Sequence, residues 1–223
     1  MIHELRIYET SPGGLGALNE QFGSSTIKLF EKHGIKNFGY WTELIGTSNR
    51  LVYIVGFEDL AHRERAWDSF RQDPERQERM RAVAQQSGPP LVTRITNVIL
   101  APTAYAPRAP KGGNVWVYEL RKYDALPGHL PALNERFANT TTRLFEKHGI
   151  HNIGYWTEEV GVSNRLDYMV AYESLGMRDQ VWGAFGQDPE WQEATRKSRE
   201  AGRPVVSQIT NTILRPTDYS PLR

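Results

Sequence analysis

The chain of 223 residues contains no cysteine, which excludes disulfide bonds, thiolate nucleophiles and cysteine-ligated metals. It also lacks any apolar run near the roughly 18 residues that a membrane helix needs, so we expect no membrane partner. Charge of one sign is not in excess, since 27 basic and 26 acidic residues give a formal net charge of +1. Without a basic stripe or block we expect no nucleic-acid partner.

Several functional signatures are missing as well. There is no Gly-rich phosphate loop, no Gly-x-Ser-x-Gly elbow and no His-Glu-x-x-His motif, so nucleotide use and serine hydrolysis are unsupported. His148 and His151 have no matching pair in the first half, and we expect neither a metal nor a cofactor. Residues 1–6 lead straight into a strand pattern with no signal or transit character, which favours a cytoplasmic location.

What the sequence does contain is an internal duplication. Most of residues 4–86 return 115 positions later: Leu-Phe-Glu-Lys-His-Gly-Ile at 29–35 recurs at 144–150, and Gly-Tyr-Trp-Thr-Glu at 39–43 recurs at 154–158. A Pro-Thr-x-Tyr-x-Pro segment closes each copy. We therefore divide the chain into a first repeat at 1–107, a Pro/Gly-rich linker at 108–114 and a second repeat at 115–223.

Each repeat has the pattern of a β-α-β-β-α-β unit of the α+β class, the ferredoxin-like arrangement. Alternating residues predict a strand at 2–9, and apolar residues at helical spacing predict a helix from Leu15 to the Gly34 cap. A polar turn between strands at 36–45 and 50–57 predicts a hairpin. A second helical stretch restarts at Asp73-Pro74, and the last strand is expected at 91–100.

Such a unit covers only one face of its sheet with helices, and the other face here is too apolar for solvent. Two linked copies can cover those faces for each other. The two tandem repeats are therefore predicted to form an intrachain dimeric α/β barrel, a pseudo-dimer within one chain, while further association into a homo-oligomer stays open.

Several strings resemble the NIPSNAP family: Tyr-Glu-Leu-Arg-Lys-Tyr at 118–123, Phe-Glu-Lys-His-Gly-Ile at 145–150, and the stretch from Trp182 to Trp191. The resemblance covers both copies. It implies the dimeric α/β-barrel superfamily, whose members include cofactor-free monooxygenases, haem-binding and haem-degrading proteins, dehydratases and isomerases. The fold supplies a place for a ligand and not a mechanism. His3 stands opposite Tyr118 and Arg76 opposite Trp191, so the two halves are not expected to be equivalent.

The first strand carries the most suggestive polar residues. Glu4 and Arg6 share one face, about 7 Å apart at strand spacing, and Glu119 and Arg121 repeat them. If that face is lumenal, the pair could bind an anionic or carbonyl-bearing ligand, with a neighbouring tyrosine as hydrogen-bond donor. The alternative is a satisfied ion pair at a sheet edge or between the repeats.

Other candidates have equally plain structural explanations. His33 and His148 could act as bases or haem ligands, or could complement a helix dipole. Within Tyr40-Trp41, as in Tyr155-Trp156, one ring faces the helices and the other faces away. Trp67 and Trp182 fit helix-on-sheet packing. Asn49 and Asn164 suit a turn with positive φ, from which the following arginine could reach a cavity mouth.

These residues define the predicted site. The candidate catalytic residues are Arg6, Arg121, His33, His148, Tyr40 and Tyr155. The candidate substrate-binding residues are Glu4, Glu119, Trp41, Trp156, Asn49, Asn164, Arg50, Arg165, Tyr53, Tyr168, Trp67 and Trp182. We expect the barrel to bind a small hydrophobic or aromatic organic molecule, with any catalysis being metal-free acid/base chemistry of monooxygenase, isomerase or cyclase type. A non-catalytic interaction or scaffold protein and a haem-binding protein are the alternatives.

Overall fold

The computed structural model describes residues 1–85, 90–107, 115–200 and 205–223, and the predicted linker at 108–114 lies outside them. Both repeats follow the predicted βαββαβ order. The first contains β1 (Ile2–Thr10), α1 (Leu15–Gln21), η1 (Phe22–Thr26), α2 (Ile27–Lys32), β2 (Lys36–Ile45), β3 (Arg50–Phe57), α3 (Leu60–Gln72), α4 (Pro74–Ala84) and β4 (Val92–Pro102). The second contains β5 (Val117–Ala125), α5 (Leu130–Arg136), η2 (Phe137–Thr141), α6 (Thr142–Lys147), β6 (His151–Val160), β7 (Arg165–Tyr172), α7 (Leu175–Gln187), α8 (Pro189–Glu200) and β8 (Val206–Pro216).

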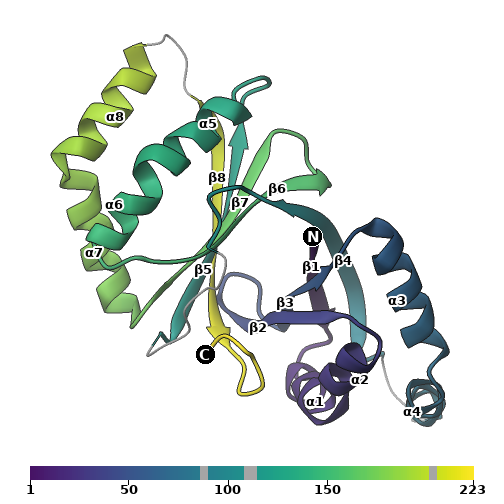
Figure 1. Ribbon diagram of the computed structural model, residues 1–223. Helices are drawn as coiled ribbons and strands as arrows, with labels where there is room; N and C mark the ends of the chain where they lie inside the picture. The colour runs from purple at the N-terminus through teal and green to yellow at the C-terminus, as the bar shows by residue number, and fades with distance from the viewer. Residues whose placement is uncertain (86–89, 108–114, 201–204) are drawn as a thin grey trace.

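The two sheets join edge to edge into one closed antiparallel barrel. Its strand order is β1-β3-β2-β8-β5-β7-β6-β4, so the seams between repeats are β2–β8 and β4–β6. Helices of the first repeat cover one outer side of the barrel and those of the second cover the other (Figure 1). Closure leaves neither sheet with an unpaired edge strand. The predicted intrachain dimeric α/β barrel is confirmed.

The face of β1 that carries Glu4 and Arg6 points toward the helices, contrary to the lumenal hypothesis. Leu5 belongs to the cluster that contains side chains of both repeats inside the barrel, whereas Glu4 bonds to Arg63 and Trp67 of α3. Strand side chains alternate, so Arg6 also faces the helices. The expectation that Glu4, Arg6, Glu119 and Arg121 point into the lumen is wrong, because the barrel interior is the apolar face of the sheets.

The barrel interior is a packed core shared by the repeats. Trp41 and Trp156, which are almost completely buried, lie in it together with Met169 and Leu214. Each indole lies against a glycine two residues earlier on its own strand: a Cβ added at Gly39 would overlap the Trp41 ring. The glycine therefore makes room for the largest side chain in the lumen.

Helix geometry differs from the sequence prediction at one point. The helix expected to run continuously from Leu15 is interrupted by a π-helical turn at Phe22–Thr26, and the second repeat has the same turn at Phe137–Thr141. Such turns are rare and occur often at functional sites. The turn changes which side chains face the sheet after residue 21.

The tails of the repeats are exchanged. Beyond β4, the backbone N–H of Thr103 donates to the carbonyl of Tyr155 at 3.0 Å, and the Tyr105 hydroxyl donates to Asn134 at 2.6 Å. Beyond β8, the chain returns the contact, with the Tyr219 hydroxyl 2.7 Å from Asn19. Each tail therefore packs on the other repeat. Within the described part of the chain, no helix has the length and apolar character needed to cross a membrane.

The glycine beneath each lumenal indole gives a direct test of the core. Gly39→Ala is expected to destabilise the protein by about 1–3 kcal/mol, because the added methyl group overpacks the lumen. Gly183 lies in α7 with nothing within 4 Å of an added Cβ. Gly183→Ala should therefore raise stability by about 1 kcal/mol. Urea unfolding measures both changes; equal effects from the two alanines would contradict the packing described.

Candidate functional site

A buried carboxylate accepts several hydrogen bonds between the sheet and the helices of the first repeat. Glu4 is completely buried and accepts hydrogen bonds from Arg6 at 2.6 Å, from Arg63 at 2.8 and 2.9 Å, and from the indole of Trp67 at 2.9 Å. Burial by itself acts to raise the pKa of Glu4, but the hydrogen bonds and positive charges outweigh it and hold that pKa below its ordinary value. The carboxylate is therefore ionised and fixed.

Arg6, which Glu4 holds in place, also donates hydrogen bonds to two tyrosines. Its Nε donates to the hydroxyl oxygen of Tyr53 at 2.9 Å and its Nη2 to that of Tyr8 at 3.1 Å, while its guanidinium carbon lies 4.6 Å from the Trp67 ring centroid. Both phenol oxygens accept from Arg6, and Tyr53 also hydrogen-bonds to Tyr8, so the proton that can be donated elsewhere is that of Tyr8. The guanidinium also favours any negative charge that develops on either oxygen.

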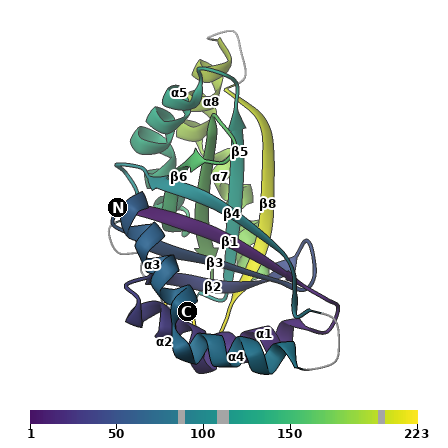
Figure 2. The ribbon, with the colours of Figure 1, turned by 90° about the vertical axis from the view of Figure 1, so that its right-hand side faces the viewer.

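A cavity of about 310 Å³ opens beside Tyr8. Its lining residues come from β1, from β4 and from the helical segments of the first repeat. Figure 2 shows how these strands and helices are arranged. The π-helical turn supplies Phe22, Ser25 and Thr26 to its wall, and Phe70 and Met80 come from α3 and α4. A mainly apolar cavity with a few polar groups at its edge is the usual form of a small-molecule site.

The second repeat contains the same cluster with one additional hydroxyl group, that of a tyrosine. Arg121 donates to Tyr168 at 2.8 Å and to Tyr123 at 3.2 Å, and Arg178 donates to Glu119 at 2.8 and 2.9 Å. Where the first repeat has Phe57, the second has Tyr172, whose hydroxyl lies between Trp182 and Glu119 at 2.6 and 3.0 Å. The Tyr172 hydroxyl therefore links the Trp182 indole to Glu119, whereas the Trp67 indole donates to Glu4 directly.

The aromatic pair on β2 divides between the two faces as predicted. Tyr40 and Tyr155 face the helices, and each is stacked on its neighbour Tyr53 or Tyr168 with centroids 5.4 and 5.5 Å apart. Their hydroxyls donate to the side chains at 37 and 152 in the same strand. Because those protons are already used, the geometry gives Tyr40 and Tyr155 the role of core residues packed on Tyr53 and Tyr168.

The histidines at the helix C-termini are tied to helix caps. His33 contacts Asp73 through Nε2 at 2.8 Å and Ser69 through Nδ1 at 2.7 Å, and His148 contacts Asp188 through Nε2 at 2.8 Å. The two aspartates cap α4 and α8 at their N-termini. With these ring nitrogens engaged at the outer helices, a role as general base or haem ligand has no geometric support, and the helix-terminal role is the one observed.

The predicted turn residues lie at the barrel end. Asn49 and Asn164 have φ of 63° and 58°, the left-handed conformation expected for them. Arg50 bonds to Glu9 at 2.8 Å, and Arg165 bonds to Asp124 and Glu158, so both arginines tie neighbouring strands. None of these four lines the helix-side cavity of the first repeat.

Two cationic residues of the cluster were not predicted. Arg63 and Arg178 complete the coordination of Glu4 and Glu119 from α3 and α7. The signal was present, since the two arginines recur at the repeat offset and each precedes a predicted tryptophan by four residues, which places both side chains on one helix face. Gln21 and Arg76, which line the cavity, carry no such repeated signal.

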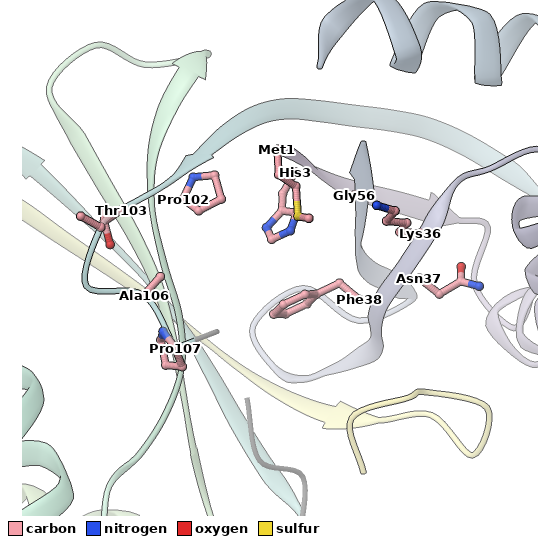
Figure 3. A pocket seen from close by; sticks show the side chains of 11 residues that line it. Met1, His3, Lys36, Asn37, Phe38, Gly56, Pro102, Thr103, Ala106 and Pro107 are labelled. Carbon is pink, nitrogen blue, oxygen red and sulfur yellow. The ribbon is translucent and has the colours of Figure 1, made fainter. Parts of the chain in front are cut away.

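A second hollow of about 500 Å³ lies where the tail of the first repeat passes the barrel mouth. Figure 3 shows His3 and Phe38 facing it, with Pro102 and Pro107 on the other side. The Trp156 indole donates to Nδ1 of His3 at 2.7 Å, a bond between the repeats. Burial, together with the nearby α-ammonium group, lowers the pKa of His3 to about 4, so the ring is neutral near pH 7.

The described residues contain no group of three or more His, Asp or Glu side chains placed to hold a metal ion. Fold and cluster together define a class: an α/β barrel built from two ferredoxin-like halves, each with an arginine–tyrosine cluster under its helices. The particular family follows from a direct match. The NIPSNAP family model matches residues 3–107 and again residues 118–221, so the chain belongs to the NIPSNAP family.

Known relatives agree with this assignment. The mouse protein NipSnap homolog 3B is 28% identical over 222 residues, covering 99% of this chain and 85% of the mouse protein. A putative monooxygenase from Lactobacillus acidophilus superposes with a TM-score of 0.62 at 13% identity, over 96% of this chain and 92% of that one. An anthrone oxidase-like protein superposes with a TM-score of 0.58 at 12% identity, over 97% and 91%. At these identities the two structures show a shared fold.

The central carboxylate can be tested by removing its charge. Glu4→Gln is expected to cost about 3–5 kcal/mol at pH 7, because Arg6 and Arg63 would be left buried without a counter-ion. The folded-state pKa of Glu4 is lowered, so this contribution is complete above 4.5 and is lost as the pH falls further. Urea unfolding at pH 7 and pH 3 measures it. Glu75→Gln, at an exposed pair with Arg79, should cost about 0.5 kcal/mol or less; equal costs would refute the assignment.

The bond between the repeats predicts a pH dependence. His3 has an ordinary pKa of 6.5 and a folded value of about 4, so between these pH values the unfolded chain binds more protons. Stability from this group therefore falls as the pH falls, by up to about 1.4 kcal/mol per unit. The wild-type protein should lose stability relative to His3→Gln across this window. Asp167, whose pKa burial raises to about 6, acts oppositely but is present in both proteins. A constant difference would contradict the prediction.

Proposed function

We propose that this NIPSNAP-family chain binds a small hydrophobic, aromatic molecule in the helix-side cavity of its first repeat. The observation that carries the proposal is the Tyr8 hydroxyl, which Arg6 holds at 3.1 Å at the edge of an otherwise mainly apolar cavity of about 310 Å³. That volume lies at the lower end of the usual range for small-molecule sites, about 300–1,000 Å³. The ligand would place a carbonyl or phenol oxygen against Tyr8.

The same arrangement supports metal-free acid/base chemistry. Tyr8 would donate its proton to the ligand oxygen, and Arg6 would stabilise the phenolate that results. Because Glu4 fixes Arg6, no reorganisation of the charged groups is needed during the proton transfer. Reactions of the monooxygenase, isomerase or cyclase type share this step, and the folds of a putative monooxygenase and an anthrone oxidase-like protein make an aromatic ketone a reasonable probe.

The scaffold alternative accounts for part of the structure. A barrel filled by Trp41, Trp156 and Met169 is what a purely structural protein would have. A cavity on the helix side, with an ordered arginine–tyrosine pair at its edge, is what such a protein would not need. Small-molecule binding is therefore the better-supported proposal, and the cytoplasmic location and further oligomerisation stay predictions.

Anthrone, a three-ring aromatic ketone, tests both parts under nitrogen and with EDTA present. Tyr8→Phe should weaken its binding about tenfold, the value of one hydrogen bond of about 1.4 kcal/mol. Acid/base chemistry at the ketone would also speed deuterium exchange at the methylene carbon in D2O, because Tyr8 protonates the carbonyl oxygen while solvent water takes the methylene proton. Tyr8→Phe should slow that exchange about 100-fold. Calorimetry and proton NMR measure the two effects.

The matched control is Tyr105→Phe, which also removes one phenol hydroxyl but in the tail packed on the second repeat. It should change neither binding nor exchange. Anthrone binding that is equal in wild type, Tyr8→Phe and Tyr105→Phe, or no binding at all, would overturn the proposal. Binding through Tyr8 without accelerated exchange would reject the catalytic step alone.

A further inference from the structure

The two helix-side clusters are not interchangeable, because their arginines stand at different positions. Tyr8, Phe22, Phe30 and Phe70, which line the first-repeat cavity, return as Tyr123, Phe137, Phe145 and Phe185. Several other lining positions change type, among them Gln21, which is replaced by Arg136, and Arg76, which is replaced by Trp191. The second repeat therefore has a guanidinium at the end of α5, directly before the π-helical turn.

Arg136 is the unusual member of the cluster. Its guanidinium carbon lies 5.6 Å from the Trp191 ring centroid, and Trp191 is in turn packed on Phe185 with centroids 4.5 Å apart. The Nε atom is buried and has no hydrogen-bond partner. Within the described part of the chain no carboxylate pairs with Arg136, whereas Arg121 and Arg178 both bond to Glu119.

An unpaired, mostly buried cation is costly unless something compensates for its lost hydration. Stacking on Trp191 supplies only part of this, since a cation–π contact is worth less than the hydration that a buried guanidinium loses. Burial accordingly lowers the pKa of Arg136 below its ordinary value. A ligand bearing one negative charge would supply the counter-ion that Arg136 lacks among the described residues.

The surrounding groups narrow the class of anion. Tyr123 accepts from Arg121 and can donate its own proton, so an oxygen between Tyr123 and Arg136 would find donors on both sides. A guanidinium fork matches a planar carboxylate in two-point contact. Glu119 already pairs with Arg121 and Arg178, so Arg136 is the guanidinium of this cluster that is left for a ligand carboxylate. The rings of Trp191 and Phe185 suit an aromatic body.

We propose that the helix-side site of the second repeat binds an aromatic monocarboxylate, anchored by Arg136. This inference rests on the proposed function, namely that helix-side sites take small aromatic ligands. It adds a second site, in which Arg136 favours a carboxylate over a neutral ligand.

The test uses 2-naphthoate and its neutral counterpart 2-naphthamide, each titrated into the full chain by calorimetry at low salt. Arg136→Gln gives the second repeat the residue that the first repeat has at this position. It should weaken 2-naphthoate binding at least tenfold and leave 2-naphthamide binding unchanged. Arg136→Lys keeps the charge and should retain part of the affinity, and the binding should weaken as salt is raised.

Arg143→Gln is the matched control, because it removes one positive charge from the neighbouring α6 at an exposed pair with Glu190. It should leave both affinities as in the wild type. Equal 2-naphthoate affinity in wild type and Arg136→Gln would overturn this inference while leaving the proposed function standing if 2-naphthamide still binds. Failure of both probes to bind the wild-type chain would overturn the two together.

Discussion

The structure depends on one constraint: each four-stranded sheet has two apolar faces and its own helices can cover only one. Closing the barrel buries the second face of both sheets against each other, around Trp41, Trp156 and Met169. That core is shared, so neither half retains its packing without the other, and the exchanged tails tie each half to its partner again. A filled lumen leaves the layer between sheet and helices as the place where a ligand can be held. The polar face of β1 belongs to that layer for the same reason.

Because the two halves are fused in one chain, their helix-side sites could diverge while the cluster beside each site was preserved. The Glu–Arg–Tyr cluster is preserved in both repeats with nearly the same distances. In the lumen, Trp156 donates to His3, whereas the indole N–H of Trp41 and the hydroxyl of Tyr118, at the equivalent positions, have no hydrogen-bond partner. Ile7 and Val52 are replaced by the ion pair of Lys122 and Asp167, joined at 2.6 Å. On the helix side, Arg136 and Trp191 replace Gln21 and Arg76. A homodimer of single repeats could not make these changes on one side only.

Much of this fold was predictable, because it rests on local periodicity and on the repeat. The hairpin strands 36–45 and 50–57, the left-handed asparagines and the Asp73-Pro74 helix start are all confirmed. Alternation showed that Glu4 and Arg6 share one face of β1, but not which face would meet the helices, since both faces carry large side chains. The π-helical turn at Phe22–Thr26 was not predictable, because the apolar spacing from Leu15 onward fits a continuous helix. The cavity brings together residues from both ends of the repeat, and the tail exchange depends on seams that only closure defines. The site residues of β1 and α3 could therefore be predicted from the sequence, whereas the residues that line the cavity could not.

The central claim is that ligands enter the helix-side layer and not the barrel lumen, and the four methionines report on this directly. Met80 lines the helix-side cavity of the first repeat, whereas Met169 lies in the packed lumen. Methyl-labelled methionine can be followed by NMR while anthrone is added under nitrogen. The account predicts that the Met80 signal shifts with ligand concentration and that the Met169 signal stays in place. A titration in which Met169 shifts and Met80 does not would place the ligand inside the barrel and contradict the account.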